Sequence, residues 1–192
     1  MSKGSLFVVT GPSGAGKGTV LGRMLKETDN IFLSVSATTR APREGEKEGV
    51  NYYYLTKEQF ESKIEKKQFL EYATYAGNYY GTPKGPVYSR MRRGEDVVLE
   101  IDLQGAMNIR KKYKDAVFIF LAPPSMEELE RRLRARGTED EEHILMRLKR
   151  AREECAASDK FDHIVINDDL DVAVEEMKSI VINVRNNRTG GK

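Results

Sequence analysis

Residues 6–19 read LFVVTGPSGAGKGT, a short β-branched and aromatic run followed by a glycine-rich loop that carries one lysine. Residues 20–25, which come directly after it, are mostly apolar and have a helical pattern. Strand, loop and helix in this order are the context that a phosphate-binding loop requires. Glycines let several backbone N–H groups point at one anion, and the helix start adds its positive end. We therefore expect this loop to bind a nucleoside triphosphate, with Lys17 as a mobile charge for the β- and γ-phosphates.

The loop departs from the usual pattern at one position. Such loops place Ser or Thr directly after the lysine, where the hydroxyl ligates Mg²⁺. Here that position is Gly18, and the hydroxyl follows at Thr19. Thr19 is expected either to bind a phosphate or to reach the metal through water, so the direct metal ligands stay open. The alternative, a glycine-rich turn with an exposed lysine, is disfavoured by the strand before the loop and the helix after it.

Composition limits the classes of protein that the chain can belong to. The 192 residues suffice for one compact domain with a core; 39% are hydrophobic and 32% charged, as in a soluble globular protein. The formal net charge of +2 gives no global basic field for a nucleic-acid polymer. No apolar run is long enough to span a bilayer. A single cysteine, Cys155, excludes an internal disulfide and fits a reducing, cytoplasmic environment.

Strand-like and helix-like segments alternate along most of the chain. Buried parallel strands are predicted over residues 6–10, 97–101, 117–121 and 163–166. Helices are predicted over residues 19–27, 103–112, 125–136, 141–157 and 170–185. Ser125 and Glu128 form a capping-box pattern, and residues 169–171 offer acidic caps for the last helix. This alternation predicts an α/β fold with a doubly wound parallel sheet flanked by helices.

Residues 34–83 interrupt this alternation with a segment rich in Thr, Tyr and Gly. Arg40 and Arg43 lie among hydroxyl side chains, and residues 52–54 and 79–80 are tyrosines. Arginine binds phosphate bidentately, and a phenol can reach a phosphate oxygen. We therefore expect a second anion site here, around a helical piece at residues 57–67. The alternative is that the arginines are surface charges and that Tyr52, Tyr54 and Tyr79 are sheet-packing residues. Residues 44–48 are interpreted as a solvated turn.

Two phosphate sites in so short a chain suggest phosphoryl transfer between nucleotides, and here a resemblance becomes evident. The sequence resembles the guanylate kinase family, whose members convert ATP and GMP to ADP and GDP. The motifs that carry the resemblance, in chain order, are GPSGAGKGT at 11–19, SVSATTRAPR at 34–43, GNYYGT at 77–82, IDLQG at 101–105, RGTE at 136–139 and VIND at 165–168. They cover essentially the whole chain. The resemblance implies a P-loop kinase fold with a mixed GMP-binding insertion and a helical lid.

The resemblance also implies roles for individual residues. The implied ATP-binding residues are Gly11, Pro12, Ser13, Gly14, Ala15, Gly16, Lys17, Gly18, Thr19 and Asn167. The implied GMP-binding residues are Ser36, Arg40, Arg43, Tyr52, Glu71, Tyr80, Thr82 and Asp102. Lys17, Arg136 and Arg147 are the implied catalytic residues, and Mg²⁺ is the implied cofactor, entering with ATP. Glu100 stands where an aspartate is common in the family.

The resemblance implies that Glu71 reads the guanine base, and the chemistry of guanine supports this role. Guanine presents its N1–H and exocyclic amino donors side by side, and an ionised carboxylate offers two acceptor oxygens. Adenine has an acceptor at N1 and would face lone-pair repulsion. A site built this way can reject the wrong base by on the order of 10⁴-fold. Without the resemblance, the context of Glu71 after residues 68–70 favours a surface position.

Residues 131–136 form a dense basic run, which by composition alone is typical of a solvated helix face. By resemblance, this region is a mobile lid that closes over ATP, with Gly137 as a hinge. Arg136 and Arg147 would touch the transferring phosphoryl group, with Arg132 and Arg134 as further candidates. Arginines delivered by closure can stabilise the charge that spreads over the equatorial oxygens in the transition state. His143 and His163 lie in no motif and are interpreted as structural or surface residues.

The predicted organisation is one domain over residues 1–192. Its core comprises residues 1–33, 84–125 and 158–192, its GMP-binding insertion residues 34–83, and its lid region residues 126–157. We expect a monomer or small homo-oligomer that acts on ATP and GMP, with no nucleic-acid polymer or membrane as partner. Two other functions stay open: a non-catalytic guanylate-kinase-like module that binds peptides, and a kinase for another nucleoside monophosphate. The intact phosphate loop distinguishes this chain from such modules, which tend to lose it.

Overall fold

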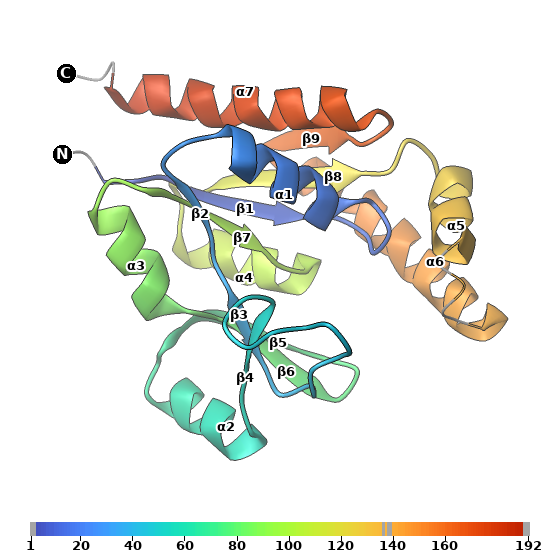
Figure 1. Cartoon of the computed structure of the whole chain (residues 1–192), viewed down its shortest axis with the longest axis horizontal. Coiled ribbons are helices and arrows are strands. Elements are labelled where there is room, and N and C mark those ends of the chain that lie inside the picture. Colours follow the sequence, from blue (N-terminus) through green and yellow to red (C-terminus); the bar gives the residue numbers. More distant parts are fainter. Residues whose placement is uncertain (1–2, 136, 138–139, 190–192) are drawn as a thin grey trace. The chain divides into compact units, whose positions relative to one another are not determined.

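The computed structural model describes residues 3–135, 137 and 140–189, and the chain divides into two compact units. The first unit comprises Lys3–Leu6 and Asn30–Ala116, and the second comprises Phe7–Asp29 and the described residues from Val117 onward. Both units combine strands with helices (Figure 1).

Parallel strands form the centre of the second unit. They are β1 (Leu6–Thr10, in this unit from Phe7 on), β8 (Val117–Ala122) and β9 (His163–Ile166). β8 pairs with both of the others in parallel, with Val8 opposite Phe118 and Phe120 opposite Ile164. Every residue of β1 is buried, as its β-branched and aromatic composition predicts.

The helices of the second unit are α1 (Lys17–Glu27), α5 (Met126–Ala135), α6 (Glu141–Ala156) and α7 (Leu170–Thr189), with a 3₁₀ turn at Ser158–Lys160. α7 packs against both α1 and β9 (Figure 1). α5 and α6 share their own apolar cluster, made of Leu129, Leu133, Ile144, Leu148 and Ala151. The predicted helices are confirmed here with small shifts at their ends, and the last one is four residues longer than expected.

Helix caps were predicted with partial success. Asp169 caps α7 by accepting from the backbone N–H of Asp171 at 2.8 Å and of Val172 at 3.1 Å, as expected. Ser125 caps α5 by accepting from the N–H of Glu128 at 3.1 Å. The Glu128 carboxylate, however, bonds Arg131 and Arg132, because guanidinium groups offer charge-assisted hydrogen bonds.

The first unit contains the parallel pair β2 (Ile31–Leu33) and β7 (Asp96–Glu100), with Phe32 opposite Val97. Its helices include α3 (Lys84–Arg92), which packs against β7, and α4 (Leu103–Lys112). β7 and α4 were predicted, but β2 and α3 were not. β2 has only three residues, and α3 opens with Lys-Gly-Pro, a start that proline tolerates only because first-turn N–H groups need no helical partner.

The interrupting segment forms a four-stranded sheet in the order β4-β3-β6-β5. The strands are β3 (Ser36–Thr38), β4 (Tyr52–Tyr54), β5 (Phe69–Tyr75) and β6 (Asn78–Pro83), accompanied by α2 (Lys57–Glu65). β3 and β4 are parallel, and the other pairs are antiparallel, so the sheet is mixed as predicted. Phe60 stacks on Tyr79 with ring centroids 5.1 Å apart, which confirms the packing interpretation for Tyr79.

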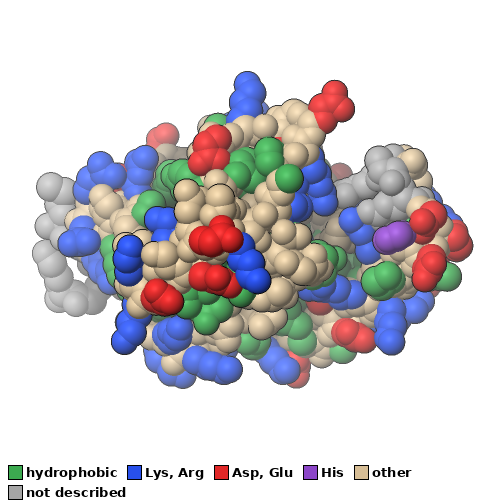
Figure 2. Space-filling model, turned by 90° about the horizontal axis from the view of Figure 1, so that it is seen from below, with side chains coloured by type: hydrophobic (Ala, Val, Ile, Leu, Met, Phe, Trp, Pro, Cys, Tyr) green, Lys and Arg blue, Asp and Glu red, His purple; other side chains and the backbone are tan. Residues whose placement is uncertain are grey.

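The α/β class and the parallel strands flanked by helices are therefore confirmed. Lys and Arg side chains are interspersed with Asp and Glu on the face shown in Figure 2, in keeping with the small net charge. Within the described residues, no helix combines the length and apolar character that crossing a membrane demands.

Candidate functional site

The glycine-rich loop of the second unit joins β1 to α1 (Figure 1). Gly14 and Gly16 have φ values of +96° and +92°, which L side chains rarely adopt. A Cβ on Gly16 would also lie 2.3 Å from Nδ2 of Asn167. Glycine is therefore required here both by the backbone conformation and by the close approach of a neighbouring side chain.

Lys17 is the first residue of α1 and extends back over the loop. Its ammonium group donates to the carbonyl oxygen of Gly11 and, at 3.2 Å, to that of Pro12. The loop carbonyls thus hold the positive charge beside the start of α1, where backbone N–H groups have no helical partner. Lysine charge and helix start together favour an anion at this place.

Asn167 follows β9 and is buried against the same loop. Its Nδ2 donates to the carbonyl oxygen of Ala15 at 2.7 Å, and its backbone N–H donates to that of Ala122 at 2.8 Å. Asn167 therefore supports the loop backbone from the end of the sheet. This contact is additional to the ATP-binding role that the resemblance implies for Asn167.

Arg147 of α6, one of the arginines expected in the lid, contacts the loop. Its NH1 donates to the hydroxyl of Ser13 at 3.3 Å. Arg132 is half-buried and bonds Glu128 and the carbonyl oxygen of Asn167, while Arg134 pairs with Glu130 and Glu141 at the surface. Arg136 lies outside the described residues.

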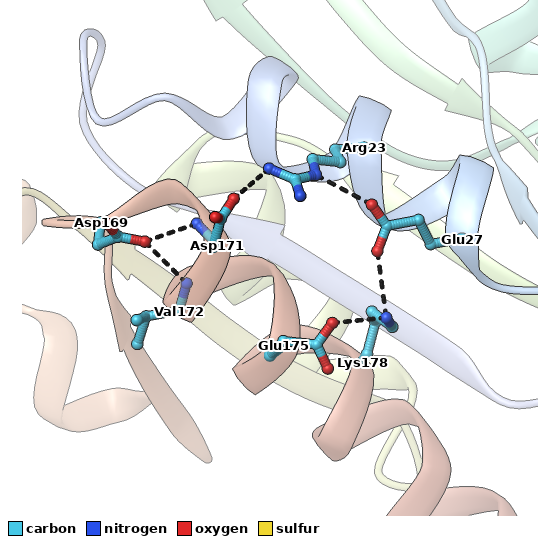
Figure 3. Close-up of polar contacts among 7 residues, drawn as sticks. All are labelled: Arg23, Glu27, Asp169, Asp171, Val172, Glu175 and Lys178. Atoms are coloured by element: carbon cyan, nitrogen blue, oxygen red, sulfur yellow. Dashed lines mark hydrogen bonds and ion pairs between the residues drawn. The ribbon is translucent and has the colours of Figure 1, made fainter.

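A polar network joins α1 to α7 (Figure 3). Arg23 of α1 bonds Asp171 of α7, and Lys178 of α7 bonds Glu27 of α1 at 3.1 Å. Arg23 and Glu27 also pair with each other at 2.9 Å, so the network continues along α1. Surface pairs of this kind contribute little individually, about 0–1 kcal/mol each. Together they help to hold α1, which carries Lys17, in place against α7, which follows Asn167.

A second group of predicted residues meets in the first unit. The Arg40 guanidinium lies 5.5 Å from the centre of the Tyr52 ring. The Tyr52 and Tyr80 rings meet edge-on with centroids 6.0 Å apart. The Glu46 carboxylate raises the pKa of the Arg40 guanidinium, and the nearby Tyr80 phenol adds to this shift. One arginine and two phenols therefore converge from β4, β6 and the segment after β3.

Residues 44–48 contain an exposed turn, as interpreted, but Glu46 within them is half-buried. Its side chain is 18% exposed, and its two oxygens accept from NH2 of Arg40 at 2.8 and 2.9 Å. Oε2 also accepts from the N–H of Arg43 and the hydroxyl of Tyr54, each at 2.8 Å. The hydrogen bond from Arg40 lowers the pKa of the Glu46 carboxyl to about 2. Glu46 is therefore an anchor that orients Arg40.

Two other predicted GMP residues occupy less enclosed positions. Ser36 begins β3 opposite Tyr52 and is half-buried. The side chain of Arg43 is exposed, and its backbone N–H bonds Glu46. The structure brings Ser36 and Tyr52 together by strand register, and it connects Arg43 to the same carboxylate as Arg40.

Glu71 and Thr82 form a buried polar pair between β5 and β6. Glu71 is only 5% exposed, and its Oε1 accepts from the Thr82 hydroxyl at 2.8 Å. Its Oε2 faces the first turn of α4, where Asp102 caps the helix by accepting from the N–H of Gly105 at 2.8 Å. The surface position that local context favoured for Glu71 is therefore wrong.

Burial raises the pKa of the Glu71 carboxyl to about 7. The hydrogen bond from Thr82 opposes this shift, and the negative charge of Asp102 adds to it. A buried carboxylate that is costly to ionise needs donors to compensate for lost hydration. Two N–H donors side by side on a ligand would supply them.

Comparisons with known proteins agree with this geometry. The profile of the family described as "Guanylate kinase" matches residues 3–184. The guanylate kinase of Carboxydothermus hydrogenoformans is 50% identical over 181 residues, which are 94% of this chain and 89% of that protein. The guanylate kinase of Clostridium tetani is 51% identical over 181 residues, 94% of this chain and 86% of that protein.

The chain belongs to the guanylate kinase family. A crystal structure of guanylate kinase from Anaplasma phagocytophilum has a TM-score of 0.79 and 34% identity, and the match covers 95% of this chain and 86% of that one. The P-loop kinase fold expected for a guanylate kinase family member is thereby confirmed.

Sequence reasoning missed two residues that contact the candidate sites of this guanylate kinase family chain. Glu46 lies three residues after Arg43 and six after Arg40, and a tight loop brings the three together. This spacing matches no helix or strand pattern, so it gave no signal in the sequence. Gly105 was quoted in a motif without a role, although a Cβ there would contact Glu71. Both act on a neighbouring side chain, so only tertiary contacts make them recognisable.

Proposed function

We propose that this chain transfers the γ-phosphoryl group of ATP to GMP, giving ADP and GDP. The observation that carries the proposal is the buried Glu71 carboxylate, held by Thr82 in the unit that also carries the Arg40, Tyr52 and Tyr80 cluster. A buried acceptor pair suits the guanine edge, and an arginine with two phenols suits a monophosphate. Family membership supports the same substrates.

For ATP, we propose that the loop of residues 11–16 and the start of α1 bind the triphosphate. Lys17 would move from the loop carbonyls to the β- and γ-phosphates, since a lysine ammonium is a mobile point charge. Arg147 is supported by its contact with Ser13 of this loop. Arg136 keeps its proposed catalytic role from the resemblance alone.

For GMP, we propose that Ser36, Arg40, Arg43, Tyr52 and Tyr80 bind the phosphate. Glu71 and Thr82 would read the base, with Asp102 close to the nucleotide. The anchoring of Arg40 by Glu46 supports this assignment, because an arginine fixed in place loses less side-chain freedom on binding an anion.

For the metal, the donor set of the chain fits Mg²⁺ that enters with ATP. Among the described residues, no group of three or more His, Cys, Asp or Glu side chains could form a protein cage. Mg²⁺ is usually held by substrate phosphates, water and one or two protein oxygens. Thr19, exposed at the start of α1, could supply such an oxygen directly or through water. When bound, the ion neutralises charge on the transferring phosphates.

The proposed reaction needs no general base. The GMP phosphate is already an anionic nucleophile, so positioning and charge neutralisation carry the catalysis. Residues 126–157 would act as a lid that closes over ATP and excludes water, which would otherwise hydrolyse it. The separate apolar cluster of α5 and α6 supports this, because it lets the two helices move as one body. Gly137, with φ of +62°, lies between α5 and α6, so as the proposed hinge it would adjust one helix against the other within the lid.

Residues 34–83 would form the GMP-binding insertion, and residues 1–33, 84–125 and 158–192 the core. The test is an assay of ADP release with Mg²⁺, ATP and each nucleoside monophosphate in turn. We expect turnover with GMP to exceed turnover with AMP, CMP or UMP by orders of magnitude. Equal turnover with another monophosphate would reassign the base, and no turnover with any would contradict the proposed activity.

A further inference from the structure

Gly105 lies buried in the first turn of α4, three residues after the Asp102 cap. Its φ is not positive, unlike those of Gly14 and Gly16. The backbone conformation at this position therefore suits any L residue, and alanine would be the better helix former. Something other than conformational freedom must account for a glycine here.

The space around Gly105 supplies the reason. A Cβ at this position would lie 2.7 Å from Oε2 and 3.2 Å from Cδ of Glu71, and 3.3 Å from Oδ1 of Asp102. The first distance is shorter than van der Waals contact permits. The two side chains that a methyl group would meet are thus the proposed base-reading carboxylate and its acidic neighbour.

The Glu71 carboxylate has little room in which to yield. It is 5% exposed, and its other oxygen accepts from the Thr82 hydroxyl at 2.8 Å. A methyl group on Gly105 would push Oε2 away from α4 and rotate the carboxylate about its bond to Thr82. Because hydrogen bonds weaken steeply with distance and angle, a shift of a few tenths of an ångström would misdirect both acceptor oxygens.

We propose that Gly105 is a positioning residue for base selection: its missing side chain leaves the space in which the Glu71 carboxylate is held facing the base. This inference deepens the proposed function and rests on it. The two oxygens of the Glu71 carboxylate are thus positioned from two sides: α4 lies against Oε2, and the Thr82 hydroxyl bonds Oε1. Gly105 has no side chain, so its effect on the base would be exerted through the Glu71 carboxylate.

A purely structural role would also explain a glycine where α4 packs against β5. The three nearest atoms, however, are all side-chain atoms of Glu71 and Asp102, and none belongs to the β5 backbone. The steric demand therefore falls on a movable carboxylate and spares the packing of the helix on the sheet. The two roles predict different consequences for Gly105→Ala.

The experiment compares Gly105→Ala with Gly22→Ala. Gly22 lies inside α1, and a Cβ there would meet nothing within 4 Å, so both changes improve helix propensity but only one crowds Glu71. For Gly105→Ala we expect the KM for GMP to rise about tenfold and the GMP-over-AMP preference to fall, with the KM for ATP and the melting temperature retained. Gly22→Ala should match the wild type in both KM values and in base preference. Unchanged KM and base preference in folded Gly105→Ala would overturn the inference, as would a lowered melting temperature with equal losses for ATP and GMP.

A double-mutant cycle with Glu71→Gln tests whether the two residues act through one carboxylate. Adding Gly105→Ala to Glu71→Gln should change the GMP-over-AMP preference by less than twofold, because the interaction is already lost. Full additivity would refute the inference while leaving GMP turnover by the wild type intact. If wild-type protein fails to phosphorylate GMP, the proposed function fails first, and the inference falls with it.

Discussion

The loop of residues 11–16 and the Glu71 site bind their proposed ligands by different means. The loop offers backbone N–H groups, glycine conformations and one lysine, all within a few consecutive residues. The Glu71 site is assembled from residues on β5, on β6 and at the start of α4, which are up to 34 residues apart in the sequence. A contiguous motif can be recognised from the sequence, whereas an assembled site also needs the strand register and helix placement.

The two regions also differ in what a substitution should damage. The loop presents a positive end of backbone dipoles, and the catalytic side chain proposed beside it, Lys17, is cationic. The Glu71 site buries a negative charge, which is costly unless donors compensate for it. Changes in the loop should therefore remove phosphoryl transfer for every substrate, whereas changes around Glu71 should alter which base is accepted.

The largest effect is expected for Lys17→Met, which removes the mobile charge and keeps an unbranched chain. Turnover should fall on the order of 10³-fold or more, because the Lys17 charge would no longer stabilise the negative charge on the transferring phosphates. Base preference in the residual activity should stay as in the wild type. ADP release with GMP and with AMP measures both quantities.

Lys26→Met is the matched control for this change. Lys26 is exposed in the last turn of the same helix, so its loss removes an equal charge from α1 away from the loop. It should retain wild-type turnover. Near-normal turnover in folded Lys17→Met would mean that the loop is not the catalytic triphosphate site.

Glu71→Gln should give the next largest effect, because the amide replaces one acceptor with a donor. We expect kcat/KM for GMP to fall on the order of 10²–10³-fold, since a buried donor would face the donor edge of guanine. The KM for ATP should be unchanged. Glu65→Gln, an exposed substitution on α2, controls for charge alone. Retained preference for GMP over AMP in Glu71→Gln would remove Glu71 from base reading.

Local signals made the loop and most of the parallel-strand framework predictable. β1 is a five-residue run of buried β-branched and aromatic residues, and the glycines that follow it have the conformations that only glycine adopts readily. Asp169 was predicted as a cap because its oxygen can reach N–H groups two and three residues ahead. Such contacts join residues that are close in the sequence, so they can be predicted from the sequence alone.

Burial and tertiary proximity account for the failures. Nothing local distinguishes Glu46 from its neighbours Glu44 and Glu48, yet only its carboxylate receives both Arg40 and the Tyr54 hydroxyl. Glu71 follows three residues that would suit a surface strand, and its burial depends on β6 and α4 arriving beside it. These positions depend on the folding of segments that are far apart in the sequence.

Glu71 should also make the stability of the protein fall as the pH rises, because ionising a buried carboxyl group is costly. The cationic loop buries no such acid. Burial raises its pKa from 4.5 to about 7, so the folded protein binds this proton more tightly than the unfolded chain. Its contribution to stability is fully present below pH 4.5 and is lost as the pH rises through 7. Between pH 4.5 and 8, the free energy of unfolding of the wild type should therefore fall relative to Glu71→Gln by about 3 kcal/mol.

Urea unfolding of both proteins at several pH values, without nucleotide, measures this difference. Glu65→Gln should show no such pH-dependent difference from the wild type, because its side chain is exposed. Parallel curves for wild type and Glu71→Gln across this range would show that the carboxylate titrates normally, and that its burial costs nothing.

The smallest effect is expected for Glu46→Ala, which releases Arg40 from its anchor. The KM for GMP should rise about five- to tenfold with little change in kcat, because a freed guanidinium must be ordered again when the phosphate binds. Glu44→Ala, in the same loop with its side chain exposed, should behave as the wild type. A KM that falls in Glu46→Ala would reverse the interpretation. Glu46 would then compete with the substrate phosphate for Arg40, and the first unit would bind GMP by displacing its own carboxylate, just as the loop must release Lys17 from its own carbonyl groups.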